Sequence, residues 1–235
     1  MSYRTGPKIV TDGLVCCLDA ADRNSYSGSG GTWYDLSGND NHGTLSGNLD
    51  SSDWSNGAFT FSGNEWVQND SFSVTPQNNE LSICLWYLTS NNANNSMIID
   101  LCNTNNTSVY RDRFSIRQNW TGVNPARTSF YFKNSLNQFR YTNLLDQVVT
   151  NTWNHIGYTK ISNTIYGYLN GELINSNNSA TGDIAAINRL LIGQDNLLGS
   201  NKLSGKVSSV SIYDHGLYGE EILQNYNATK GRFGL

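Results

Sequence analysis

Segments in which apolar and polar residues alternate dominate the chain, and turns rich in Gly, Asn and Ser separate them. This period-2 pattern predicts β-strands that turn one face toward a core. The glycine-rich stretch 21–47 has no apolar run, and we expect it to be a long ordered loop. The predicted strands are 13–20, 58–63, 81–88, 97–102, 113–117, 128–132, 138–142, 165–169, 172–176, 189–193 and 206–213.

Three local signals refine this pattern. The segment 81–88 is apolar at nearly every position, which predicts a central strand covered on both faces. Asn170-Gly171 lies between two alternating segments, and this dipeptide is typical of a type I′ hairpin turn whose two residues have positive φ. Pairing across the turn puts Ile165 and Leu169 on one face and Tyr168 on the other. The apolar phase of 206–213 breaks once, which indicates a β-bulge.

One helix is expected, over 219–226. Two acidic residues, Glu220 and Glu221, would lie in its first turn and favour the helix dipole. Three of its residues are placed to face inward: Ile222, Leu223 and Tyr226. No repeat or linker divides the chain, so the sequence predicts an N-terminal arm over 1–12, one β-sandwich over 13–227 and a tail over 228–235.

Composition narrows the function. Only 14% of the residues are charged, against ~25% in ordinary domains, whereas Asn, Ser, Thr and Gly make up roughly two residues in five. A net charge of −4 without basic runs argues against nucleic-acid binding, and no apolar stretch is long enough to span a membrane. The N-terminus lacks the apolar segment of a secretory signal. We expect four buried free thiols in a reducing compartment: Cys16, Cys17, Cys84 and Cys102.

The order of short motifs resembles the laminin-G-like, concanavalin A-like jelly rolls. The resemblance spans about 13–226 and implies an all-β sandwich of two antiparallel sheets with one short C-terminal helix. Its motifs are GLV at 13–15, WYDLSGNDNHGT at 33–44, FTFSG at 59–63, LSICLW at 81–86, TWNHI at 152–156, YLNGEL at 168–173, LIG at 191–193, LSGKV at 203–207, IYD at 212–214 and EEI at 220–222.

Sequence motifs near the two chain ends resemble a narrower group of proteins within these jelly rolls. GPKIVTDGL at 6–14, LDAADR at 18–23 and NYNATKGR at 225–232 resemble sandwich proteins from tailed-phage virions, cyanophage-like ones especially. That resemblance implies a structural or adhesive component of a virion, such as a head decoration or a fibre-like appendage, made in the host cytoplasm. The alternative is a carbohydrate-binding, lectin-like module that acts on host or environmental polysaccharide.

Catalysis is not expected. Glycosidases of this fold need two carboxylates that face each other across the sugar, and glucanases among them carry Glu-x-Asp-x-x-Glu on one strand. The five glutamates show no such spacing, and the three histidines are scattered without partners. We therefore expect a protein without enzymatic activity.

A calcium site is an open alternative, because many relatives fold the glycine-rich loop around a metal. Hard cations need several oxygen ligands, and Asp19 and Asp35 are the candidates here. In the competing interpretation these aspartates form Asx-turns that hold the loop without an ion. Ser208 and Ser209 stand where relatives often carry acidic residues, which removes two candidate ligands.

Glycan binding needs an aromatic face and polar neighbours. Trp66, Trp86 and Trp153 are expected in the core, so the candidates are two loop tryptophans. The predicted glycan-binding residues are Trp54, Trp120, Asn119 and Asn124. The competing interpretation is that these rings plug the end of the sandwich.

The two chain ends are candidates for contacts in an assembly. Chain ends usually fray, but on a particle they would clamp a neighbouring capsid or tail subunit, with many copies adding avidity. The predicted partner-binding residues are Tyr3, Ile9, Val10, Phe233 and Leu235.

Overall fold

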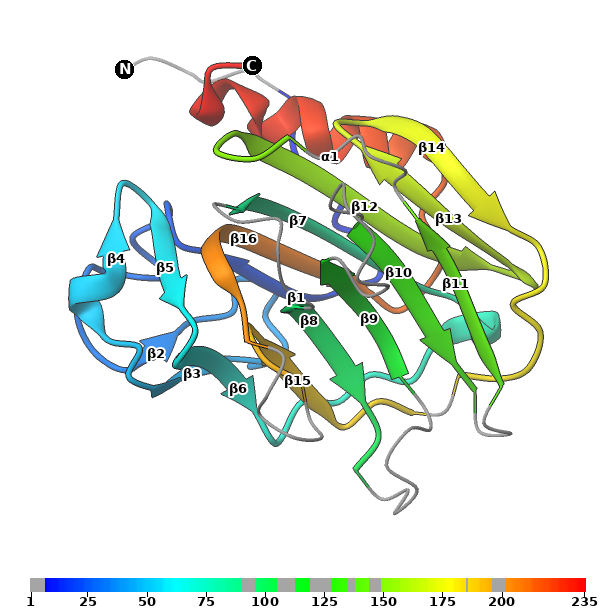
Figure 1. The fold of residues 1–235 in the computed structure, drawn as a ribbon, viewed down its shortest axis with the longest axis horizontal. Coiled ribbons are helices and arrows are strands. Elements are labelled where there is room, and N and C mark those ends of the chain that lie inside the picture. The colour runs from blue at the N-terminus through cyan, green and yellow to red at the C-terminus, as the bar shows by residue number, and fades with distance from the viewer. Residues whose placement is uncertain are drawn as a thin grey trace.

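Two antiparallel β-sheets pack face to face in the computed structural model (Figure 1). The structure describes residues 7–89, 96–104, 113–118, 128–134, 138–143, 149–184, 186–195 and 202–235. Each sheet has eight strands. The predicted all-β sandwich with one short C-terminal helix is confirmed.

The first sheet, sheet A, has the strand order β14-β13-β12-β7-β16-β5-β4, and β1 pairs with β16 beside β5. Its strands are β1 Leu14–Asp19, β4 Trp54–Ser55, β5 Ala58–Ser62, β7 Leu81–Thr89, β12 Trp153–Ile161, β13 Thr164–Leu169, β14 Glu172–Asn177 and β16 Ser204–Tyr213. The register of β16 against β7 shifts between Val207 and Ser209, where a bulge was predicted.

The second sheet, sheet B, has the order β11-β10-β9-β8-β15-β6-β3-β2. Its strands are β2 Thr32–Trp33, β3 Gly43–Gly47, β6 Glu65–Asn69, β8 Ser96–Cys102, β9 Arg113–Gln118, β10 Thr128–Lys133, β11 Phe139–Asn143 and β15 Arg189–Ile192. The prediction that 21–47 contains no strand is wrong, because β2 and β3 lie in it. They are short and polar, and they gain stability by pairing at the edge of the sheet.

Alternate residues of both sheets fill the core between them. Phe114 of β9 stacks on Tyr158 of β12 with ring centroids 4.1 Å apart, and Phe130 lies 4.6 Å from the same tyrosine. These residues are fully buried. The Asn170-Gly171 turn has φ angles of 52° and 86°, as a type I′ hairpin requires.

The outer face of sheet A is covered by the C-terminal segment. Helix α1 spans Gly219–Thr229 and the short helix η3 spans Lys230–Phe233. Figure 1 shows α1 lying along β12, β13 and β14. Ile222 is buried over Gly157, where an added Cβ would lie 2.8 Å from its side chain. The prediction that Leu223 faces inward is wrong, because it is 44% exposed.

Aromatic side chains form a second packed layer under η3. Phe233 stacks on Trp86 of β7 at 4.1 Å and lies 4.8 Å from Trp153 of β12. Tyr226 of α1 stacks on the same Trp86 at 5.8 Å. His155 is buried beside Trp86 at 5.2 Å. The tail is therefore part of the folded domain, and both faces of β7 are covered as predicted.

Removing the Phe233 ring should destabilise the domain. Phe233→Ala deletes two aromatic contacts and exposes Trp86, and we expect the free energy of unfolding to fall by about 2 kcal/mol. Urea denaturation followed by tryptophan fluorescence measures this change. The exposed Leu235 supplies the control, because Leu235→Ala should change stability by less than about 0.5 kcal/mol. Equal stability of the two variants would contradict this description of the tail.

Stability should fall in mild acid because of His155. Burial lowers the pKa of His155 to about 3, whereas an unfolded histidine titrates near ~6.5. As the pH falls, the unfolded state therefore binds the proton first. The stability that neutral, buried His155 contributes is fully present above pH ~6.5 and is lost progressively toward pH ~3. We expect a loss of about 2 kcal/mol between pH 8 and pH 5. In His155→Phe, chemical denaturation across this range should give a flatter pH profile than wild type.

Candidate functional site

A polar cleft opens where the edges of the two sheets meet. β11 is the last strand of sheet B and β14 the last strand of sheet A, so each has one unpaired edge. These edges are bridged by side chains and not by a strand ladder: Asn177 Nδ2 donates to the Tyr141 carbonyl at 2.9 Å. Arg140 Nε donates to the carbonyl of Ser179.

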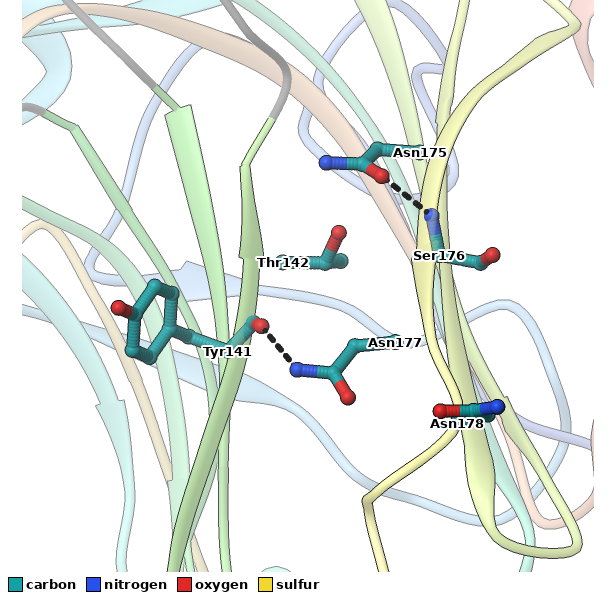
Figure 2. A pocket seen from close by; sticks show the side chains of 6 residues that line it. All are labelled: Tyr141, Thr142, Asn175, Ser176, Asn177 and Asn178. Carbon is teal, nitrogen blue, oxygen red and sulfur yellow. Dashed lines mark hydrogen bonds between the residues drawn. The ribbon is translucent and has the colours of Figure 1, made fainter.

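The cleft has a volume of about 420 Å³ and lies between these edges (Figure 2). Ligand pockets typically measure ~300–1,000 Å³. The residues that line it are Tyr141, Thr142, Asn175, Ser176, Asn177 and Asn178. The cleft is thus lined by amides, hydroxyls and one phenol-bearing residue, and the ring of Tyr141 points away from Asn177 in Figure 2.

Strand alternation places the lining side chains. Thr142 lies opposite Phe130 of β10, a core residue, so it points inward. Asn175 and Asn177 are two residues apart on β14 and share a face, and Asn177 lies opposite the core residue Ile165. The cleft therefore receives side chains from both inner faces of the sandwich.

Thr142 carries an unusual hydroxyl. Its side chain is almost fully buried, at 3% exposure. Within the described part of the chain, Thr142 Oγ1 has no hydrogen-bond partner. A buried polar atom without a partner costs ~1–3 kcal/mol, so a polar ligand that displaced the side chains covering this hydroxyl and bonded to it would recover that cost. Figure 2 shows it in the space between β11 and β14, with the Asn175 amide nitrogen also pointing toward β11.

The sequence did not indicate these residues, because Thr and Asn are common throughout the chain and β11 and β14 are far apart in it. Three of the predicted glycan-binding residues lie outside the described residues: Asn119, Trp120 and Asn124. The fourth, Trp54, is part-buried, and its Nε1 donates to the Ala20 carbonyl at 2.9 Å. Its ring lies 5.9 Å from Tyr26. Trp54 thus closes the end of the sandwich.

The predicted calcium ligands are engaged by donors of the chain itself. Asp19 forms an ion pair with Arg232 at 2.5 Å and accepts from the Ala21 N–H. Asp35 accepts four hydrogen bonds, from the backbone N–H groups of Cys17, Ser37 and Asn41 and from the Ser37 hydroxyl. The bonds from Ala21 and Ser37 are Asx-turn contacts, and Arg232 neutralises Asp19. Both carboxylates thus hold the loop through donors of the chain, which favours the Asx-turn interpretation over a calcium site.

Among the described residues, no group of three or more His, Cys, Asp or Glu side chains could hold a metal ion. Nor does any helix of the described segments have the length and apolarity to cross a membrane.

The predicted partner-binding residues are mostly engaged within the domain. Tyr3 lies outside the described residues. Val10 is buried; its N–H donates to Asn225 Oδ1 at 2.8 Å, and its carbonyl accepts from the Tyr213 hydroxyl at 3.1 Å. Ile9 is half-buried, whereas Leu235 is 54% exposed. With Phe233 packed on Trp86, Leu235 is the most accessible of the described members of this set.

The buried cysteines are poor nucleophiles at neutral pH. All four cysteines are buried and free, as predicted. Burial raises the pKa of Cys17 to about 11 and of Cys84 to about 12, so neither provides a thiolate near neutral pH. Burial also raises the pKa of Glu65, but hydrogen bonds from the Asn64 and Ser62 backbone outweigh this effect and hold it below its usual value.

Trp66 is a second difference from the sequence prediction. It was expected in the core, but the core residue of β6 is Val67, and Trp66 alternates with it. Trp66 is therefore on the outer face of sheet B and is partly exposed. Trp86 is buried and Trp153 half-buried, in the layer under η3.

Comparisons with solved structures give the same fold. The chain is 17% identical, with a TM-score of 0.66, to the ligand-binding domain of botulinum neurotoxin serotype D in complex with N-acetylneuraminic acid, over 94% of this chain. It spans about half, 52%, of that toxin chain. No curated protein matches.

Two further structures are similar to the chain. Domain 4 of AbnA, a GH43 extracellular arabinanase from Geobacillus stearothermophilus, in complex with arabinotriose, is 17% identical with a TM-score of 0.64, over 91% of this chain and 98% of that one. The heptameric SAP-like pentraxin from Limulus polyphemus is 15% identical with a TM-score of 0.56, over 71% and 79% of the two chains.

The family model of the concanavalin A-like lectin/glucanases superfamily (Laminin_G_3) matches residues 61–223. This match covers most of both sheets and the start of α1, and it agrees with the sandwich topology and the order of motifs. The chain therefore belongs to the concanavalin A-like lectin/glucanases superfamily.

Proposed function

We propose that this domain is a non-catalytic, lectin-like module that binds neutral glycans in the cleft between β11 and β14. The observation that carries the proposal is the buried Thr142 hydroxyl, which has no partner among the described residues and belongs to the wall of a cleft lined by side-chain amides. Sugar hydroxyls both donate and accept hydrogen bonds, and so do amides and hydroxyls of the protein. The lining residues carry no carboxylate and no cation, which favours an uncharged sugar.

The absence of catalysis is part of the proposal. Glycoside hydrolysis needs a protonated acid next to the glycosidic oxygen and a second carboxylate. The cleft lining has neither. Two of the similar structures are named as complexes with N-acetylneuraminic acid and with arabinotriose, which supports a sugar as the ligand class.

We further propose that the module is displayed in many copies on a tailed-phage virion, where it contacts capsid or tail subunits and presents its cleft to cell-surface glycans. The motifs at the chain ends support this role. Because Val10 and Phe233 are used inside the domain, the attachment surface would instead use the exposed apolar side chains on and near α1: Leu173, Tyr218 and Leu223. The particle would be assembled from protein made in the host cytoplasm.

Replacing the Thr142 hydroxyl should separate binding from stability. Thr142→Val keeps the shape of the side chain and removes an unpaired buried hydroxyl, so the melting temperature should stay constant or rise slightly. Glycan affinity should fall about fivefold to tenfold, because one hydrogen bond of ~1 kcal/mol or more is lost. A glycan array of neutral and acidic sugars identifies the ligand, and calorimetry with that glycan measures the change.

Two controls accompany this variant. Thr142→Ser retains the hydroxyl and should retain binding. Asn48→Ala changes an exposed asparagine outside the lining of the cleft and should bind like wild type. If Thr142→Val binds every glycan as tightly as wild type does, the cleft is not the binding site.

The virion role is tested on purified particles. Mass spectrometry of gradient-purified virions should detect this chain in many copies per particle. Tyr218→Ser with Leu223→Ser should lower its copy number while leaving the isolated domain folded, because both side chains are exposed. Absence of the chain from washed particles would end this part of the proposal.

A further inference from the structure

A row of polar and aromatic side chains runs along the outer face of β6. Trp66 and Gln68 alternate with the core residue Val67 and share this face. Asp70 follows directly after the strand. Hydrogen bonds connect the three: Trp66 Nε1 donates to Gln68 Oε1 at 2.9 Å, and Gln68 Nε2 donates to Asp70 Oδ2 at 3.4 Å.

Neighbouring strands widen this row. On one side, β3 places Thr44 opposite Gln68 and Ser46 opposite Trp66. On the other side, Arg189 of β15 forms an ion pair with Asp70, with Nε and Oδ1 2.6 Å apart. A hollow of about 270 Å³ lies at this end, lined by Asp70, Arg189 and Thr104.

The Trp66 ring is held in place before any ligand arrives. Gly47 has a φ of +68°, and a Cβ there would lie 2.2 Å from a ring carbon of Trp66. The ring therefore lies across a position that only glycine fits. Lys202 Nζ lies 5.7 Å from the ring centroid. With the hydrogen bond to Gln68, these contacts fix the ring orientation, so binding there would cost little side-chain entropy.

We propose that this outer-face row, from Trp66 to Asp70 and Arg189, is a second binding site, which takes an extended neutral oligosaccharide. The Trp66 ring offers an apolar face for a pyranose, and Gln68, Asp70 and Arg189 offer donors and acceptors for its hydroxyls. Four residue steps along a strand at about 3.4 Å make the row about 14 Å long. A single sugar ring is shorter than that, so the ligand that uses the whole row is a chain of sugars.

A neutral sugar suits this row. Asp70 and Arg189 form an ion pair, so their charges largely cancel and they offer hydrogen-bonding groups to sugar hydroxyls without a net charge. The proposed ligand class is the same as in the cleft between β11 and β14, but the site is on a different surface and uses different residues. Binding at one site can therefore be shown or disproved without affecting the evidence for the other.

The test uses linear neutral tetrasaccharides of glucose, mannose and xylose, with the matching disaccharides. At least one tetrasaccharide should bind several-fold more tightly than its disaccharide. Trp66→Ala should lower that affinity about tenfold, whereas Trp66→Phe, which keeps an aromatic face, should retain most of it. Thermal melting of each variant shows whether it is folded.

A second readout does not depend on variants. The indole N–H resonance of Trp66, assigned with Trp66→Phe, should shift when the tetrasaccharide is added to the wild-type chain. Loss of affinity in Trp66→Ala but not in Thr142→Val supports this inference even if the cleft does not bind. Loss in Thr142→Val alone, an unshifted indole resonance, or no tetrasaccharide binding at all would overturn it.

Discussion

Every part of the architecture depends on one constraint: β7 is apolar on both faces, so both faces must be shielded from water. Sheet B shields the inner face through residues such as Phe114 and Phe130. The outer face cannot be left open, and α1, η3 and Val10 cover it. Because both chain ends contribute to this cover, Val10 and Phe233 pack within the domain and are not free to bind a partner. It also leaves the edges of the sheets and the outer face of sheet B as the surfaces where polar chemistry can gather.

The elements that the sequence predicted correctly are those set by local physics. The Asn170-Gly171 turn requires positive φ at two residues, and few dipeptides tolerate this. The bulge in β16 leaves a visible phase break, and β7 is recognisable because nearly all of its residues are apolar. In each case the signal lies within about ten residues, so no knowledge of tertiary neighbours is needed.

The failures come from interactions between distant segments. β2 and β3 are short and carry no apolar run, and they become strands only because β3 pairs with β6 and β2 pairs with β3. The periodicity of α1 places Leu223 among the inward-facing residues. In the structure Leu223 lies against the hairpin turn at Gly171 and is 44% exposed. The burial of two tryptophans could not be predicted either: Trp54, expected to be exposed, is partly buried against the core, and Trp66, expected in the core, is partly exposed on the outer face of sheet B. The cleft itself joins β11 to β14, whose residues carry no local mark.

The bridge between β11 and β14 has a mechanical consequence. Within each sheet, neighbouring strands are joined by ladders of backbone hydrogen bonds. Between β11 of sheet B and β14 of sheet A, the two sheets are connected by individual side chains such as Asn177. A ligand held by both Thr142 and Asn175 would act as a cross-link between the layers. Occupancy would then stiffen the domain along the direction in which the layers separate, so a force that pulls the two sheets apart would act where the ligand itself reinforces the domain.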